Sequence, residues 1–278
     1  MPELPEVEVT RLGIQPHLEG ERITDALIID GRLRWPVPRN LRAILLGQTL
    51  HGIERRGKYL LFQMDQGYLL IHLGMTGVLR VLPVREPLKP HDRVVVVFGK
   101  RSLRLHDPRK FGAVLWHANT SGPIEDHPLL RKLGTEPFSA DFANERGAAV
   151  LYRCSRGRSV AVKSFLLAGQ AVVGVGNIYC SESLFEAGIH PAKQAGKLTK
   201  PQCARLASAV RTVLKKAIAA GGSTLRDFVD SEGKQGYFTM QSKVYDRRGE
   251  PCRICSTPIK QIVQGQRSTY FCPACQKR

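Results

Sequence analysis

The chain of 278 residues has no long apolar run. Its longest apolar stretch of β type, Val94–Phe98, is far shorter than the roughly 20 residues that a transmembrane helix needs. The first residues, MPELPEVE, are acidic, and no apolar segment of a signal peptide follows them. Internal repeats and low-complexity tracts are also missing. We therefore expect a globular, cytoplasmic protein with no membrane partner.

Acidic residues are scarce relative to basic ones. The chain has 24 Asp and Glu against 42 Lys and Arg, which gives a formal net charge of +18. Such an excess suits a polyanion better than a small neutral metabolite. Nucleic acid is the leading candidate partner. An anionic membrane surface would also attract a basic protein, but it trails, in line with the expectation of no membrane partner. A hydrophobic share of 42% can supply real cores, and the length favours two domains with a small appendage.

The cysteines are too unevenly placed for a disulfide framework. There are seven, an odd number, and Cys154, Cys180 and Cys203 stand singly. The other four form two CxxC pairs near the C-terminus, separated by sixteen residues. This spacing is typical of a four-thiolate zinc site, with a hairpin between the pairs, although a redox dithiol is an alternative. The predicted ligands of one structural Zn²⁺ are Cys252, Cys255, Cys272 and Cys275.

Hydrophobic patterning divides the chain into a β-rich part and a helical part. Residues 2–19 have Pro and Glu in a first turn and Gly20 as a stop, which predicts a helix. Short runs of branched residues then alternate with turn signals as far as Trp116, as in an antiparallel sandwich or barrel. The expected strands are 23–29, 58–64, 68–73, 94–98, 102–106 and 113–116.

Helical signals follow a connecting segment at 119–137, which is rich in Pro and Gly. Thr199 is a suitable N-cap, and apolar residues recur behind it at helical spacing until Gly221 and Gly222. The opposite face of this predicted helix carries Arg and Lys. We therefore expect a basic helix packed on the core of a second domain.

The N-terminus combines two prolines and two glutamates directly after a removable methionine. Excision of Met1 would leave Pro2 as a secondary amine that, by analogy with α-amino groups of pKa about 8, is partly neutral and nucleophilic. The positive end of the helix favours this neutral amine and an ionised Glu3. Its attack on an aldehyde-like carbon would give an iminium ion, a strong electron sink. Helix statistics alone also explain both residues as ordinary first-turn residues.

Other segments decide between these interpretations. PELPEVE, RRGKYLL, IHLGMTG, DPRKFG, VVGVGNIYCSESLFEAGIHP and the CxxC pairs, in this order, resemble bacterial formamidopyrimidine-DNA glycosylases over the whole chain. The resemblance implies an α+β fold: an N-terminal helix plus antiparallel β-sandwich, then a helical helix-two-turn-helix domain and a C-terminal zinc-finger β-hairpin. The expected ranges are 1–118 for the catalytic sandwich, 119–137 for a linker, 138–236 for the helical domain and 237–278 for the zinc finger.

The resemblance also implies the chemistry. Such an enzyme is a monomeric glycosylase and AP lyase of the bacterial nucleoid, which removes 8-oxoguanine and formamidopyrimidines from double-stranded DNA and cuts the strand by β,δ-elimination. By position, Pro2 would attack C1′ of the damaged nucleotide, and Glu3 would be the acid that helps to open the sugar. Lys58 would act in β-elimination. Arg267 would act in δ-elimination and hold a phosphate.

Further residues match DNA-contacting positions of the family. Met75, Arg109 and Phe111, here called the wedge residues, would fill the gap left by an extruded base. As alternatives, Met75 and Phe111 are core residues and Arg109 is a solvated charge, but the flanking glycines favour exposed loops. Residues 221–237 resemble a loop that covers the lesion, although they could equally be a flexible connection, and Lys58 could be an ordinary surface group. The remaining predicted DNA contacts are His91, Arg158, Lys163 and Asn177, although His91 could be an ordinary surface group and Asn177 a helix cap.

Two alternative functions remain open. One is an endonuclease VIII-type glycosylase for oxidised pyrimidines, and the other is a DNA-binding protein without catalysis. The start PELPE and the pair Arg109 and Phe111 favour oxidised purines over the first alternative. The second alternative requires that Met1 stays in place.

Overall fold

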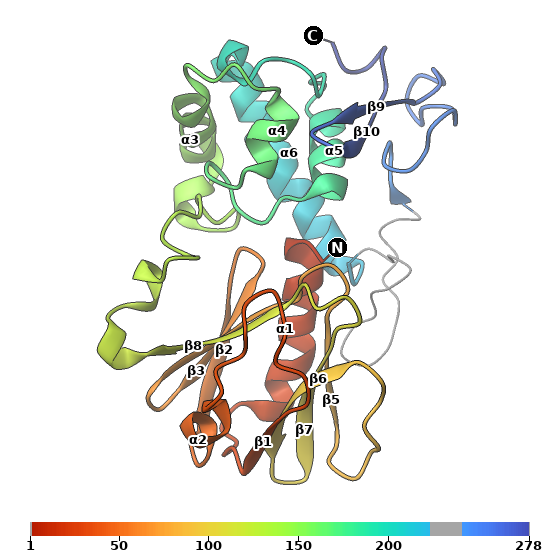
Figure 1. The fold of residues 1–278 in the computed structure, drawn as a ribbon. Coiled ribbons are helices and arrows are strands. Elements are labelled where there is room, and N and C mark those ends of the chain that lie inside the picture. The colour runs from red at the N-terminus through yellow and green to blue at the C-terminus, as the bar shows by residue number, and fades with distance from the viewer. Residues whose placement is uncertain (1, 223–240, 278) are drawn as a thin grey trace. The chain divides into compact units, whose positions relative to one another are not determined.

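The computed structural model describes residues 2–222 and 241–277, which group into two compact units (Figure 1). The first unit contains 2–131 and 220–222, and the second contains 132–219 and 241–277. The segment 119–137, predicted as a linker, is thus divided between the units. Its first part forms two short 3₁₀ turns, Asn119–Ser121 and Ile124–Asp126. The expected boundary at 236/237 and most of the segment predicted to cover the lesion lie outside the described residues.

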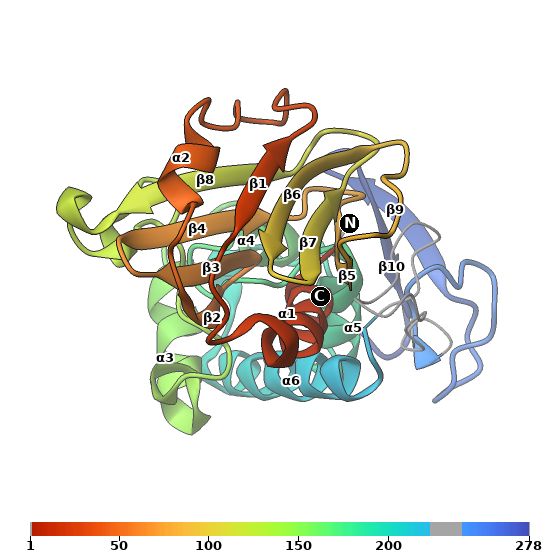
Figure 2. The same ribbon diagram turned by 90° about the horizontal axis from the view of Figure 1, so that it is seen from below.

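The first unit combines helix α1 with two antiparallel four-stranded sheets. One sheet has the order β1-β6-β7-β5 and the other has the order β2-β3-β4-β8. Their strands run in crossing directions (Figure 2). The elements are α1 (Leu4–Leu18), β1 (Asp25–Ile28), α2 (Leu41–Leu45), β2 (Leu50–Arg56), β3 (Tyr59–Met64), β4 (Gly67–His72), β5 (Val78–Pro83), β6 (Asp92–Phe98), β7 (Arg101–His106) and β8 (Ala113–Ala118).

Burial explains why the sequence forms these elements. In β6, which lies between β1 and β7, all positions from Val94 to Phe98 are buried, so the run is continuously apolar. Helix α1 buries Leu4, Val7 and Ile14 and contacts β2 and β5, one strand from each sheet. The sequence patterning did not predict β2, β5 or α2. Strand β2 buries only Leu50 and Ile53, and β5 buries only Val78 and Leu79, so neither shows a regular pattern of buried apolar residues.

The second unit holds a helix-two-turn-helix element. Helix α4 (Val162–Leu167) is followed by turns over 168–176 and then by α5 (Asn177–Glu186). The other helices are α3 (Asn144–Ser155), two short 3₁₀ helices (Ala140–Phe142 and Ala195–Lys197) and α6 (Lys200–Ala219). Thr199 caps α6 as predicted, because its Oγ1 accepts the Gln202 N–H at 3.3 Å and Gln202 Oε1 accepts the Thr199 N–H at 3.1 Å.

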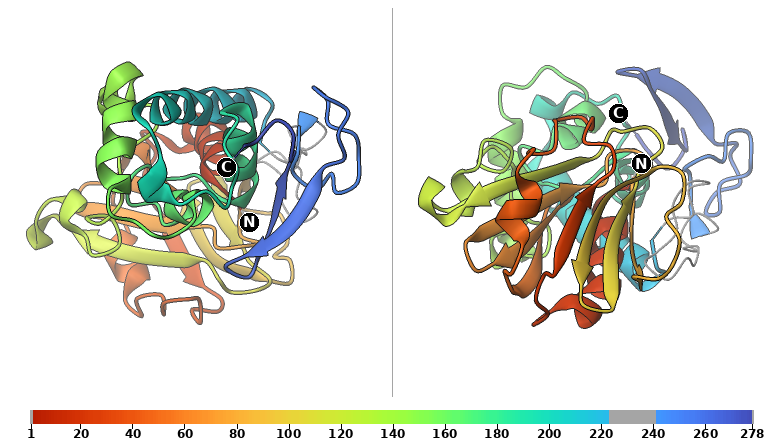
Figure 3. Two further views of the ribbon diagram at one scale, coloured as in Figure 1. Left: turned by 90° about the horizontal axis from the view of Figure 1, so that it is seen from above. Right: turned by 60° about the horizontal axis from the view of Figure 1, so that its bottom comes forward.

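A two-stranded hairpin completes the second unit beside α5 (Figure 3). Strands β9 (Lys260–Gln264) and β10 (Arg267–Phe271) pair antiparallel. Gly265 and Gln266 join them with φ of 53° and 60°, the left-handed conformation of a tight hairpin turn. Among residues 2–222 and 241–277, no helix is both long enough and apolar enough to cross a membrane.

Candidate functional site

The start of α1 is held in a fixed conformation. Glu3 is the N-cap and is 2% exposed. Its backbone N–H donates to Glu6 Oε2 at 2.8 Å, and the Glu3 side chain accepts the backbone N–H of Glu6 in return. Pro2, directly before this cap, is buried. The amine that methionine removal would expose therefore lies at the positive end of a helix with little conformational freedom.

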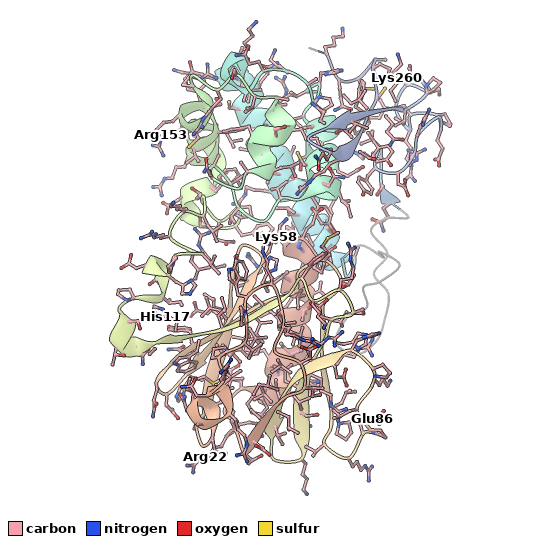
Figure 4. The ribbon with its side chains drawn as sticks, in the orientation of Figure 1. Arg22, Lys58, Glu86, His117, Arg153 and Lys260 are labelled. Carbon is pink, nitrogen blue, oxygen red and sulfur yellow. The ribbon has the colours of Figure 1, made fainter. Side chains whose placement is uncertain are left out.

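Lys58 lies at the same end of the first unit as Pro2 and Glu3. Arg55 of β2 donates to Glu8 of α1 at 2.9 Å, and Arg11 donates to the Ile53 carbonyl at 3.3 Å. Helix α1 and strand β2 are thus antiparallel, and the start of α1 lies near the turn that follows Arg56. Lys58 belongs to this turn (Figure 4). The structure therefore brings together three of the four predicted catalytic residues.

Partly buried ion pairs between Glu8 and the guanidiniums of Arg11 and Arg55 lie near this end. Burial alone would raise the pKa of Glu8, but the Arg11 and Arg55 guanidiniums outweigh it and hold this pKa below its ordinary value. Burial lowers the pKa of His72 to about 4, and the positive charges of Lys58 and Arg34 act in the same direction. His72 is therefore neutral near pH 7, and the local positive charge resides on the lysine and arginine.

The wedge residues are on the surface. Met75 is 39% exposed and Phe111 is 43% exposed, so the alternative interpretation of both as core residues is wrong. The Arg109 guanidinium lies 4.9 Å from the centre of the Phe111 ring, at cation–π distance. Solvent-exposed apolar side chains beside an arginine suit contact with stacked bases.

His91 is also exposed and has a φ of 74°, the left-handed region. Its carbonyl accepts the Asp107 N–H at 3.0 Å, and its ring Nδ1 lies 3.1 Å from Arg93 Nη2. The loop before β6 thus presents His91 in a defined conformation.

In the second unit, Lys163 and Asn177 bind the hairpin backbone next to Arg267, whose side chain is exposed. The carbonyl of Ser268, next to Arg267, accepts from Lys163 Nζ at 2.9 Å and from Asn177 Nδ2 at 3.0 Å. Asn177 is the first residue of α5, and Gly176 is the N-cap, so the alternative interpretation of Asn177 as a helix cap is wrong. Lys163 is completely buried and also donates to Thr269 Oγ1 at 2.7 Å, contacts that give it a structural role. Its contact with DNA remains a prediction.

Arg158 belongs to the loop that follows α3. It is exposed, while its backbone carbonyl accepts the Gly196 N–H at 2.9 Å. Its main chain is thus fixed and its side chain faces solvent.

Sequence reasoning missed two buried carboxylates. Asp107 is 0% exposed and accepts from Thr76 Oγ1 and the Gly112 N–H. Glu182 of α5 accepts the backbone N–H groups of residues 243–245 at 2.8 to 2.9 Å. The only available signal was that each stands within a segment that carries the family resemblance. The local sequence pattern does not indicate which groups donate hydrogen bonds to these carboxylates.

The four predicted zinc ligands converge. Their Sγ atoms all lie within 4.8 Å of one another, with separations of 3.5 Å for Cys255–Cys272 and 3.9 Å for Cys252–Cys275. Four thiolates around one tetrahedral zinc would be roughly 3.8 Å apart, so the cluster fits the ion. Hydrogen bonds to Thr257 lower the pKa of the Cys255 thiol, which favours the thiolate that a metal requires. Burial raises the pKa of the Cys272 and Cys275 thiols, so these two would become thiolates by losing their protons to metal binding.

Comparison with known proteins covers the whole chain. Family models match residues 1–114 (formamidopyrimidine-DNA glycosylase N-terminal domain), 133–229 (formamidopyrimidine-DNA glycosylase H2TH domain) and 249–278 (zinc finger found in FPG and IleRS). The last match agrees with one structural zinc on the four cysteines. A curated formamidopyrimidine-DNA glycosylase of Polynucleobacter necessarius is 73% identical over 278 residues, the full length of both chains.

Solved structures agree with the sequence comparison. A Lactococcus lactis FPG mutant in complex with Fapy-dG containing DNA superposes with a TM-score of 0.91 at 32% identity, over 100% of both chains. A MutM in complex with carbocyclic 8-oxo-G containing DNA gives 0.90 at 33% identity, again over 100% of both. The expected fold class is therefore confirmed.

Proposed function

The chain belongs to the formamidopyrimidine-DNA glycosylase family of DNA-repair enzymes, and from this premise we propose that it removes oxidised purines from duplex DNA with Pro2 as nucleophile. The substrates are 8-oxoguanine and formamidopyrimidines, and the enzyme acts as a monomer in the bacterial cytoplasm, at the nucleoid. The observation that carries the proposal is the position of Pro2 at the buried start of α1, on the same side of the unit as Lys58.

The proposed reaction begins when the Pro2 amine attacks C1′ and the damaged base leaves. The Glu3 carboxylate takes up the proton that the attacking Pro2 nitrogen must lose and passes it to O4′ of the sugar, so that the C1′–O4′ bond breaks. The product is an iminium ion between Pro2 and C1′. This ion withdraws electrons, so a proton leaves C2′ and the C3′–O bond breaks, a step in which Lys58 acts. Arg267 holds the phosphate for the second elimination. The carboxylate of Glu3 is preorganised by the reciprocal capping with Glu6.

DNA contact is distributed over both units. In the first unit the wedge residues enter the stack of DNA bases, and Arg109 hydrogen-bonds the base opposite the lesion. His91 contacts a phosphate. In the second unit Asn177 and the start of α5 contact a phosphate, helped by Arg158. Lys163 is buried and helps only indirectly, because its Nζ donates to the Ser268 carbonyl next to Arg267. The exposed positions of Met75, Phe111 and Arg109 support this assignment.

The test is borohydride trapping with a duplex that contains 8-oxoguanine opposite cytosine. Reduction of the iminium ion should join protein and DNA covalently. A form that retains Met1, in which the Pro2 nitrogen is part of an amide, should lose most of the adduct. Pro2→Gly keeps a primary N-terminal amine and should lose only part of it. Pro5→Ala is the matched control, because Pro5 lies in the same helical turn but is not N-terminal. It should trap as well as the unchanged protein.

Three results would contradict the proposal. The first is no adduct from the unchanged, Met1-free protein, and the second is an undiminished adduct from the form that keeps Met1. The third is excision of thymine glycol faster than 8-oxoguanine in a parallel assay, which would favour the endonuclease VIII-type activity.

A further inference from the structure

Two loops that carry the wedge residues run side by side. Residues 73–77, with Met75, lead from β4 to β5, and residues 107–112, with Arg109 and Phe111, lead from β7 to β8. His72 pairs with Ala113 in one sheet, and Val78 pairs with His106 in the other. Both loops therefore cross between the same two sheets, next to each other.

The backbones of these loops are in direct contact. Gly74 has a φ of 64°, and a Cβ at this position would lie 2.3 Å from the Phe111 carbonyl carbon. Only glycine leaves room for this approach. A displacement of one loop would therefore be transmitted to the other.

A single buried carboxylate joins the two loops. Asp107 is 0% exposed, and its Oδ1 accepts from Thr76 Oγ1 at 2.9 Å. Its Oδ2 accepts the Gly112 N–H at 2.8 Å. Thr76 directly follows Met75, and Gly112 directly follows Phe111, so each hydrogen bond is one residue from a wedge side chain.

The main chain of Asp107 is itself anchored. Its N–H donates to the His91 carbonyl at 3.0 Å, and its carbonyl accepts from Arg93 Nε at 2.9 Å. The carboxylate is thus held from the β6 side while it binds the two loops. A buried carboxylate is costly unless its oxygens are paired, and here each oxygen has a donor.

We propose that Asp107 is a positioning residue that joins the Met75 and Phe111 loops into one rigid wedge. This inference rests on the proposed function. A wedge of fixed geometry loses little conformational entropy when it enters the stack, and both side chains fill the gap together. The link acts when a paired base must leave the DNA double helix. It has no part in strand cleavage at an abasic site, where no base has to be extruded.

Substitutions of Thr76 can separate base extrusion from strand cleavage at an abasic site. Thr76→Val removes the hydroxyl that binds Asp107, and Thr76→Ser retains it and is the matched control. One substrate is a duplex with 8-oxoguanine opposite cytosine. The other is a single-stranded oligonucleotide with a preformed abasic site, which needs no extrusion and has no partner base. A 2-aminopurine beside the lesion reports unstacking by fluorescence, and thermal unfolding is measured for each variant.

Loss of one hydrogen bond to a charged group should slow single-turnover excision by Thr76→Val about tenfold. The 2-aminopurine signal should rise correspondingly more slowly. Cleavage of the single-stranded abasic site should stay within about twofold, and Thr76→Ser should match the unchanged protein in all three measurements. Thr76→Ala, which removes the same hydroxyl without adding a methyl group, replaces Thr76→Val if the latter does not fold.

Equal loss of both activities in Thr76→Val would overturn the inference in favour of a general structural role, and unchanged excision would overturn it directly. Failure of the unchanged protein on both substrates would instead contradict the proposed function.

Discussion

At the scale of single residues, His72 combines burial with two positive neighbours. Its Nδ1 accepts the Gly74 N–H at 2.9 Å, at the start of the Met75 loop. Burial, Lys58 and Arg34 lower its pKa to about 4, whereas an unfolded chain has the ordinary value of 6.5. Between these values the unfolded state binds more protons than the folded state. The contribution of His72 is therefore fully present above pH 6.5 and is lost as the pH falls toward 4.

We expect the free energy of unfolding to fall between pH 7 and pH 5, with a contribution from His72 on the order of 2 kcal/mol. His72→Asn should remove this contribution, because asparagine does not titrate but its oxygen can still accept the Gly74 N–H. Urea denaturation of both proteins at pH 7 and pH 5 measures the difference. An identical pH dependence of the two proteins would contradict the assignment.

At the scale of elements, the hairpin β9–β10 depends on the four thiols. Its hydrophobic cluster is small, and two of the zinc ligands, Cys252 and Cys272, belong to it. Such a cluster is insufficient to hold a fold alone, so metal binding supplies the stability.

Removal of zinc with a chelator should unfold this hairpin and weaken DNA binding. Hydrogen exchange over residues 260–271 should become fast. Trp35 and Trp116 both lie in the first unit, so their fluorescence should remain unchanged and serves as an internal control. Slow exchange after complete metal removal would show that the hairpin is stable without zinc.

Glu182 ties α5 to the segment that leads into the zinc finger. The carboxylate, 3% exposed, accepts three backbone N–H groups, including that of Val244 at 2.9 Å. Glu182→Gln would turn an amide NH₂ group toward at least one of these donors. We expect a loss of about 1–3 kcal/mol in the free energy of unfolding.

Glu186→Gln provides the matched control for Glu182→Gln. It makes the same change one turn later in α5, where the carboxylate pairs with Lys243 at the surface at 2.6 Å. This partly exposed pair should contribute about 1 kcal/mol or less. Equal effects of the two substitutions in chemical denaturation would contradict the role given to Glu182.

At the scale of the whole molecule, the net charge of +18 predicts DNA binding that weakens steeply with salt. Arg267→Gln should lower the slope of log K against log salt by about one, because one phosphate contact is lost. Arg153→Gln, on an exposed part of α3 without a predicted role, should leave the slope unchanged. Fluorescence anisotropy across a salt series measures both, and an equal change in the two variants would contradict the predicted contact.

The amino-acid sequence by itself determined the local features, which depend only on residues close together in the chain. The helix at the N-terminus, the Thr199 cap and the hairpin between the CxxC pairs follow from turns, caps and spacings over a few residues. The candidate catalytic residues came from the family resemblance, because Pro2 alone is equally an ordinary first residue of a helix. The strands β2 and β5 were missed because only two residues of each are buried, which leaves too weak an apolar pattern in the sequence.

Only the tertiary structure decided which distant residues meet. Asp107 bonds Thr76 across 31 positions, Glu182 bonds Val244 across 62, and Lys163 bonds Thr269 across 106. Such a contact cannot be inferred from the periodicity of one sequence. A buried charge requires a partner, but the sequence does not show which residue that partner is. Folding of the sheets and helices selects that partner, and so it fixes the geometry that holds the wedge loops and the hairpin.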